Sequence, residues 1–143
     1  MGEYTFQRAE IGQHSRSIRV VLIAAALQAF GCSSPCDNEV ISSRLSPDGQ
    51  LKAVVFIRSC GATTPVVTEV SVLPADAGMP EGWANAVTLS DDPAHPVQRS
   101  TEAIQVLLKW DSGRRLRVSF PQAAVAQKRA SGVKGVAIEY STF

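Results

Sequence analysis

From residue 39 onward, apolar and polar side chains alternate along the chain with the period of two that is typical of β-strands. In the stretch 51–59 both alternating sets contain apolar residues, which predicts a central strand that is covered on both faces. The most regular alternation sets Ile104, Val106, Leu108 and Trp110 against the residues between them. The predicted strands are 39–45, 51–59, 66–73, 86–89, 104–110, 115–120 and 136–140.

Short turns separate these strands. The segments 46–49 (S-P-D-G) and 111–114 (D-S-G-R) carry the Pro, Asp and Gly residues that tight hairpin turns require. The segment 121–132 has helical composition around its alanines, and we expect a short helix or an irregular crossover there. Six or seven short strands joined by turns predict an all-β domain, either an antiparallel β-sandwich or a small open barrel.

The first 31 residues have a different pattern. A short basic segment at 15–19 precedes an apolar run at 20–31, and Cys32 follows a small residue, which is the order of an export signal. The apolar run is shorter than the roughly 20 residues that cross a bilayer as a helix. We therefore expect a cleaved signal-peptide helix at 1–31, a tether at 32–38 and a β-domain at 39–143.

The residues 29–32 (A-F-G-C) resemble the lipobox of bacterial lipoproteins. The resemblance implies that Cys32 carries a lipid and becomes the first residue of the mature chain. A secreted protein without lipid, or an uncleaved helix, would instead leave Cys32 as an odd thiol. By analogy with lipoprotein sorting, Ser33 after the cysteine favours the outer membrane of the cell envelope, with the domain facing the periplasm.

Lipidation of Cys32 leaves Cys36 and Cys60 as an even pair in an oxidising compartment, which favours a disulfide. Closing that loop removes about 3.5 kcal/mol of unfolded-state entropy. A catalytic thiol at Cys60 would need a neighbouring base, and only His95 remains in the mature chain. A metal site from these three residues lacks a fourth ligand, so we expect no metal and no cofactor.

A longer stretch runs from the S-P-D-G turn at 46–49 through A-V-V-F at 53–56, Arg58 and C-G-A-T-T at 60–64 to V-S-V-L at 70–73. It is similar to a family of small uncharacterised bacterial proteins that are often lipoproteins. The likeness covers about a fifth of the chain. The family has no established activity, so the resemblance implies a compartment and a class of protein, and it assigns no catalytic residue.

Two places are candidates for recognition. The loop after Cys60 carries Gly61, Thr63 and Thr64, whose hydroxyl and backbone N–H groups beside a disulfide could bind an anion or a peptide end. The alternative is a hairpin turn whose threonines bond their own backbone. Trp83 either presents its ring to a partner or caps the open end of the core.

Two charged groups have simpler explanations. A basic cluster on the predicted hairpin is explained by a solvated outer face, with contact to lipid headgroups as the alternative. An acidic loop with one histidine could hold a divalent metal, but solvated carboxylates are the simpler interpretation. The basic cluster consists of Lys109, Arg114, Arg115 and Arg117, and the acidic loop contains Asp91, Asp92 and His95.

The net charge of +1 leaves no broad basic field for nucleic acid. No Ser/His/Asp arrangement is readable with His95 alone in the mature chain. We therefore expect a non-enzymatic envelope lipoprotein, bound to the membrane through its N-terminal lipid and acting as a binding or assembly module, for example for an envelope protein. An inhibitor of a periplasmic or host hydrolase such as a lysozyme or protease is the alternative, and a weak enzyme using carboxylates is a third hypothesis.

Overall fold

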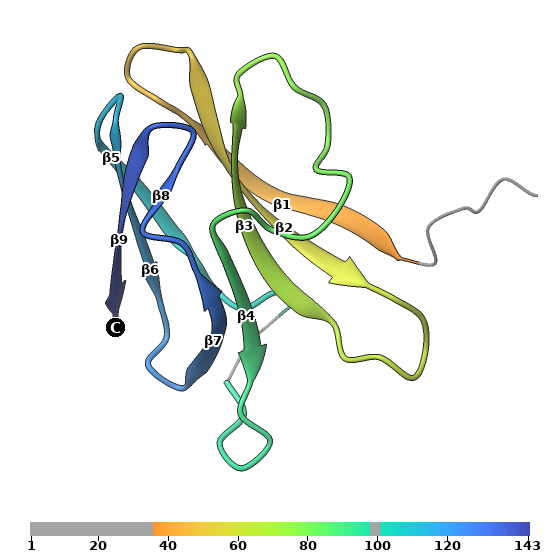
Figure 1. Cartoon of the computed structure of the whole chain (residues 1–143). Helices are drawn as coiled ribbons and strands as arrows, with labels where there is room; N and C mark the ends of the chain where they lie inside the picture. Colours follow the sequence, from red (N-terminus) through yellow and green to blue (C-terminus); the bar gives the residue numbers. More distant parts are fainter. Residues whose placement is uncertain (1–35, 98–100) are drawn as a thin grey trace, which may run out of the picture. The chain divides into compact units, whose positions relative to one another are not determined.

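The computed structural model describes residues 36–97 and 101–143, and all regular elements in these two ranges are β-strands (Figure 1). The predicted signal peptide and Cys32 lie outside the described residues. The strands are β1 Asp37–Leu45, β2 Leu51–Ser59, β3 Val67–Pro74, β4 Val87–Asp91, β5 Leu107–Ser112, β6 Arg115–Phe120, β7 Ala124–Arg129, β8 Gly132–Val133 and β9 Val136–Thr142.

The strands form two sheets that pack as a β-sandwich, which confirms the predicted fold class. The first sheet has the order β1-β2-β3-β4-β7, and the second has the order β5-β6-β9-β8. All neighbours are antiparallel except β6 and β9, which run parallel. The predicted central strand at 51–59 is β2, which lies between β1 and β3 and is buried from Ala53 through Arg58.

The expected helix or crossover at 121–132 is wrong, because residues 124–129 form β7 at the edge of the first sheet. Ala124 and Ala126 pair with Asp91 and Leu89 of β4, while Val125 between them is exposed. Pairing with β4 satisfies the backbone groups of this segment. Tertiary pairing therefore overrides the weak helical preference of its alanines.

The core lies between the two sheets and consists mostly of β-branched and aliphatic residues. The first sheet contributes alternating residues of β2, β3 and β4, and the second contributes those of β6 and β9. Ile104, just before β5, is also buried, and its N–H donates to the hydroxyl of Thr68 at 2.8 Å. The main buried residues are Ala53, Val55, Val70, Val72, Val87, Leu89, Leu116, Val118, Phe120, Val136 and Ile138.

The outer face of the first sheet is also covered, by the segment 75–86 that connects β3 to β4 (Figure 1). Val54 and Phe56 of β2 pack there against Ala84 in a second apolar cluster. Asn85 holds the segment in place because its side chain accepts a bond from the N–H of Val72 and donates to the carbonyl of Val72, both at 2.8 Å. The two faces of β2 are apolar because each is buried by a different layer.

Side chains also join the two sheets. The indole N–H of Trp110 in β5 donates to the carbonyl of Arg44 in β1 at 3.0 Å. The hydroxyl of Tyr140 in β9 lies 3.0 Å from the carbonyl of Ala86 and 2.9 Å from that of Ala130. These contacts join β1 to β5 on one side and the β4 and β7 region to β9 on the other.

Candidate functional site

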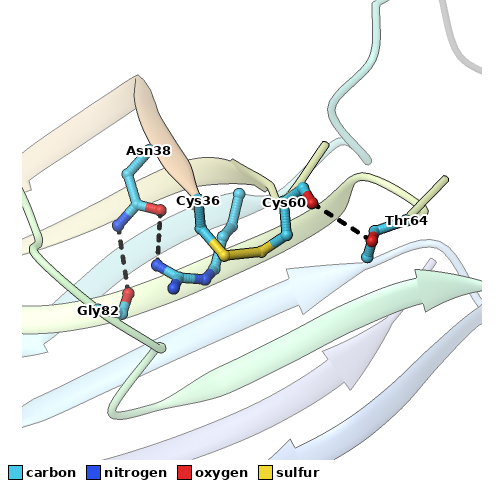
Figure 2. Close-up of a disulfide and its surroundings, with 6 residues drawn as sticks. Cys36, Asn38, Cys60, Thr64 and Gly82 are labelled. Atoms are coloured by element: carbon cyan, nitrogen blue, oxygen red, sulfur yellow. Dashed lines mark hydrogen bonds between the residues drawn. A yellow bond between two sulfur atoms is a disulfide. The ribbon is translucent and has the colours of Figure 1, made fainter. Parts of the chain in front are cut away.

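The Cys36–Cys60 disulfide closes the open end of the β1–β2 hairpin (Figure 2). Asp37 pairs with Ser59 and Asn38 with Arg58, so the two cysteines occupy the next position in the same register. Their Cα atoms are 3.9 Å apart and they are separated by 24 positions in the sequence. The predicted disulfide is confirmed, and it joins an edge strand to the central strand β2.

The loop that follows the disulfide is exposed from Gly61 through Pro65. Gly61 has a φ of 101°, a conformation that side-chain-bearing residues rarely adopt. The N–H of Thr64 donates to the carbonyl of Gly61 at 3.2 Å, and the hydroxyl of Thr64 donates to the carbonyl of Cys60 at 3.4 Å (Figure 2). Thr64 therefore bonds within its own turn, while Thr63 is exposed to solvent.

Trp83 is placed beside this end of the sheet by a set of polar contacts. The side-chain amide of Asn38 donates to the carbonyls of Pro80 at 2.7 Å and Gly82 at 3.2 Å, which ties segment 75–86 to β1. The carbonyl oxygen of the same amide accepts a bond from Arg58 at 3.0 Å. The guanidinium of Arg58 lies 4.8 Å from the centre of the Trp83 ring, a cation–π contact.

Glu69 of β3 anchors the C-terminal part of the same segment. Its side chain is fully buried, and its two carboxyl oxygens accept bonds from the N–H of Ala84 at 3.2 Å and the hydroxyl of Thr88 at 3.1 Å. Burial raises the pKa of Glu69, while these two bonds and the charges of Arg58 and Lys128 oppose the shift. Its oxygens are engaged by the fold, so this carboxyl group has a structural role under segment 75–86.

Trp83 is one of the exposed apolar residues on β1 and on the segment 75–86, which covers the outer face of the first sheet. Trp83 is 65% exposed, Met79 is 57% exposed and Val40 is 43% exposed. Val40 faces outward because it lies two positions beyond Asn38 and pairs with Phe56. We call Val40, Met79 and Trp83, with Arg58 beneath the ring, the Trp83 surface.

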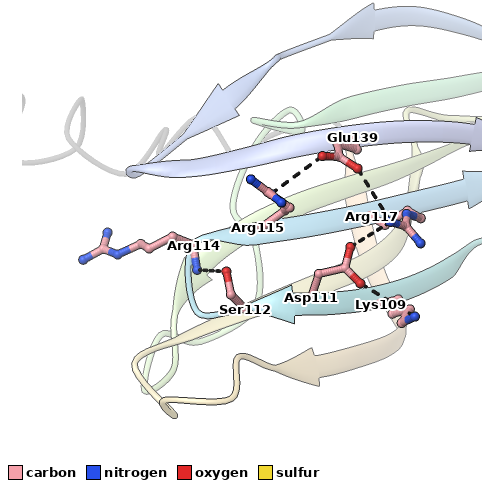
Figure 3. A network of polar contacts seen from close by, with 7 residues as sticks. All are labelled: Lys109, Asp111, Ser112, Arg114, Arg115, Arg117 and Glu139. Atoms are coloured by element: carbon pink, nitrogen blue, oxygen red, sulfur yellow. Dashed lines mark hydrogen bonds and ion pairs between the residues drawn. The ribbon is translucent and has the colours of Figure 1, made fainter.

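The basic residues of β5 and β6 lie on the solvent face of the second sheet, as the alternation predicts, and acidic neighbours pair with them (Figure 3). Arg117 lies 3.0 Å from Asp111 and 3.7 Å from Glu139. Arg115 contacts Glu139 at 3.7 Å, and Lys109 contacts Asp111 at 3.7 Å. Two carboxylates face these three positive charges and compensate them in part, so the cluster presents a mixed surface with an excess of positive charge.

The acidic loop folds on itself. Asp92 accepts a bond from the N–H of Ala94 at 2.9 Å and contacts the imidazole of His95 at 3.2 Å. These two bonds lower the pKa of Asp92. Asp91 accepts a bond from the N–H of Val97 at 3.3 Å. Within the described ranges, no three His, Cys, Asp or Glu side chains are grouped as metal ligands would be.

The sequence pointed separately to the loop after Cys60 and to Trp83, and the structure connects them through Arg58. Arg58 precedes Cys60 by two positions and supports the ring of Trp83. Arg58, Asn38 and Glu69 were not identified from the sequence as site residues. A sequence signal for them does exist. Each is a charged or amide residue in or next to a predicted strand, at a position with an apolar neighbour on the same face of the sheet.

No protein-family model matches the chain, and neither the curated proteins nor the solved structures provide a match. Among the described residues there is no helix long and apolar enough to cross a membrane.

Proposed function

We propose that the protein is a non-enzymatic lipoprotein of the bacterial cell envelope. A lipid on Cys32 holds the small β-domain at a membrane. The proposed location is the outer membrane, with the domain facing the periplasm. There the domain acts as a binding or assembly module. The proposal combines the lipobox resemblance at 29–32 with the architecture of the folded domain.

The disulfide carries this proposal. Cys36 follows Cys32 by four positions and is bonded to Cys60 at the end of the central strand β2. A tension applied at Cys32 therefore passes into the interior strand β2 and does not peel the edge strand β1. This is the connection expected of a domain that is held by its N-terminus.

The exposed features near the disulfide support a binding role. The loop at 61–65 and the Trp83 surface are both attached to rigid strands, and a preorganised surface loses little conformational freedom when it binds. Trp is also the residue type most enriched among residues that dominate binding energies.

A pull-down from detergent-solubilised envelopes tests the proposal, with the full chain as bait. We expect capture of a specific envelope component above background. Capture that never rises above background, under several solubilisation conditions, would count against a binding or assembly module.

Inhibition of a hydrolase is the second candidate function, and the exposed disulfide-bound loop at 61–65 favours it. Rigid loops of this kind can occupy an enzyme cleft with little ordering cost. Assays of lysozymes and proteases with excess protein would test it. An inhibitor should lose potency on Thr63→Ala, and an absence of inhibition across the panel would remove this candidate.

A further inference from the structure

We infer that the Trp83 surface rests on the lipid bilayer itself, with the ring of Trp83 in the headgroup region. The inference depends on the proposed function, because it requires the lipid on Cys32. It goes further in two ways. It assigns an orientation to the domain, and it assigns a lipid surface as the partner of one of its faces.

The length of the tether provides the first argument. Cys36 follows Cys32 by four positions, and four residues of fully extended chain span at most about 14 Å. The disulfide fixes Cys36 to Cys60, so this limit applies to the folded domain and not to a loose strand end. The end of the sandwich that carries the disulfide is therefore held against the membrane surface.

The chemistry of the neighbouring surface provides the second argument. Trp83 contacts Arg58, which pairs with Asn38 two positions from the disulfide. Trp is enriched where a membrane meets water, because its large ring is apolar and its N–H is polar. Val40 and Met79 add exposed apolar side chains to the same face.

The fold also holds the ring of Trp83 in place before the ring contacts the bilayer. Arg58 is itself buried, bonds to Asn38 and lies against one face of the indole. Asn38 fixes the carbonyls on either side of Glu81, just before Trp83. The backbone before Trp83 is fixed, and one face of the indole is packed against Arg58. Insertion of the ring into the headgroup region therefore costs little conformational entropy.

The charges around the surface indicate the kind of lipid. Glu81 of segment 75–86 lies two positions before Trp83 and is exposed, whereas the positive charge of Arg58 is buried beneath the ring. Anionic headgroups would be repelled by this carboxylate. The surface therefore fits a zwitterionic headgroup layer better than an anionic one.

A protein partner is a less favourable occupant. It would have to enter a gap that the tether limits to about 14 Å at the disulfide, whereas the bilayer is already present there. The second sheet remains available to a protein partner.

Tryptophan fluorescence of the lipidated mature protein in phosphatidylcholine vesicles tests the inference. The two tryptophans are separated by Trp110→Phe, in which Trp83 reports, and Trp83→Phe, in which Trp110 reports. We expect brominated phosphatidylcholine to quench Trp83 strongly and to blue-shift its emission. Trp110, bonded to Arg44 between the sheets, should respond weakly to the brominated lipid.

Three further measurements distinguish a lipid surface from a protein as the partner of the Trp83 surface. Adding phosphatidylglycerol to the vesicles should weaken the quenching of Trp83, because the exposed carboxylate of Glu81 would repel the anionic headgroups. Trp83 emission that is unchanged by brominated lipid and freely quenched by acrylamide would overturn the inference. So would loss of a captured protein on Trp83→Ala, which would assign the surface to a protein.

The tether must be confirmed on the same sample by its mass. A lipidated chain whose Trp83 stays in water refutes the membrane contact and leaves the proposed function intact. A chain without lipid on Cys32 refutes both.

Discussion

Glu69 is a fully buried carboxyl group, and it holds segment 75–86 against the outer face of the first sheet. Ala84 and Thr88 donate to its two oxygens. Burial raises its pKa, so the folded protein binds a proton at Glu69 more readily than the unfolded chain does. The contribution of Glu69 to stability is therefore complete below the usual pKa of a glutamate and declines as the pH rises through the folded-state pKa.

Glu69→Gln tests this linkage. Glutamine cannot accept bonds on both side-chain atoms, and one of the two donors loses its partner, at a cost of about 1–3 kcal/mol. The variant has no carboxyl group to titrate, so the stability difference from wild type should shrink as the pH rises above the usual pKa of a glutamate, about 4.3. Urea unfolding at several pH values measures it.

The control for Glu69 is Glu81→Gln in the same segment, where the side chain is exposed. This variant should change the free energy of unfolding by less than about 0.5 kcal/mol at each pH. A penalty for Glu69→Gln that grows with rising pH would contradict a raised pKa at Glu69.

At the scale of elements, β1 depends on few attachments. It is an edge strand whose side chains are mostly exposed, and a bulge between Val40 and Ser42 interrupts its register with β2. Besides the ladder with β2, it is held by the disulfide, by Asn38 and by the bond between Trp110 and Arg44.

Replacing both Cys36 and Cys60 by serine should therefore lower the free energy of unfolding by about 3.5 kcal/mol. It should also increase amide hydrogen exchange in β1 more than in β3, because the open end of the hairpin can then fray. Exchange measured under native conditions checks both points. An equal increase throughout the sheet would mean that the disulfide does not hold β1 locally.

The connection between β8 and β9 is a two-residue turn with both φ angles positive, 50° at Lys134 and 74° at Gly135. Asn adopts this conformation more easily than Lys, so Lys134→Asn should stabilise the protein by a few tenths of a kcal/mol, roughly. Gly135→Ala should destabilise it by about 1 kcal/mol. Thermal unfolding of both variants measures the changes in Tm. Changes of the same sign in the two variants would contradict the opposite effects that the positive φ angles predict.

On the scale of the whole molecule, the sequence predicts local structure better than pairing. Alternation at 51–59 identified a central strand, and the S-P-D-G turn has Gly49 at a φ of 68° as expected. The parallel pairing of β6 with β9 was not predicted, because it depends on how the sheets pack. Ile104 was expected in a strand, but its N–H bonds to the Thr68 side chain instead.

The candidate site was predictable in parts only. Cys60, Thr64 and Trp83 stand out by residue type, and the pairing of the cysteines followed from their even number. Their connection through Arg58 exists because segment 75–86 folds back over the sheet, with Asn38 binding its carbonyls. A loop rich in Pro, Gly and Ala carries no periodic pattern that would predict such a path.

The central claim is a domain tethered through Cys32 and clamped by the disulfide directly behind the tether. The intact mass of the membrane-extracted protein, measured before and after reduction, tests it most directly. We predict a chain that starts at Cys32, is heavier by its lipid and gains two hydrogens when Cys36 and Cys60 are reduced. A chain without lipid that carries free thiols before reduction would contradict the account.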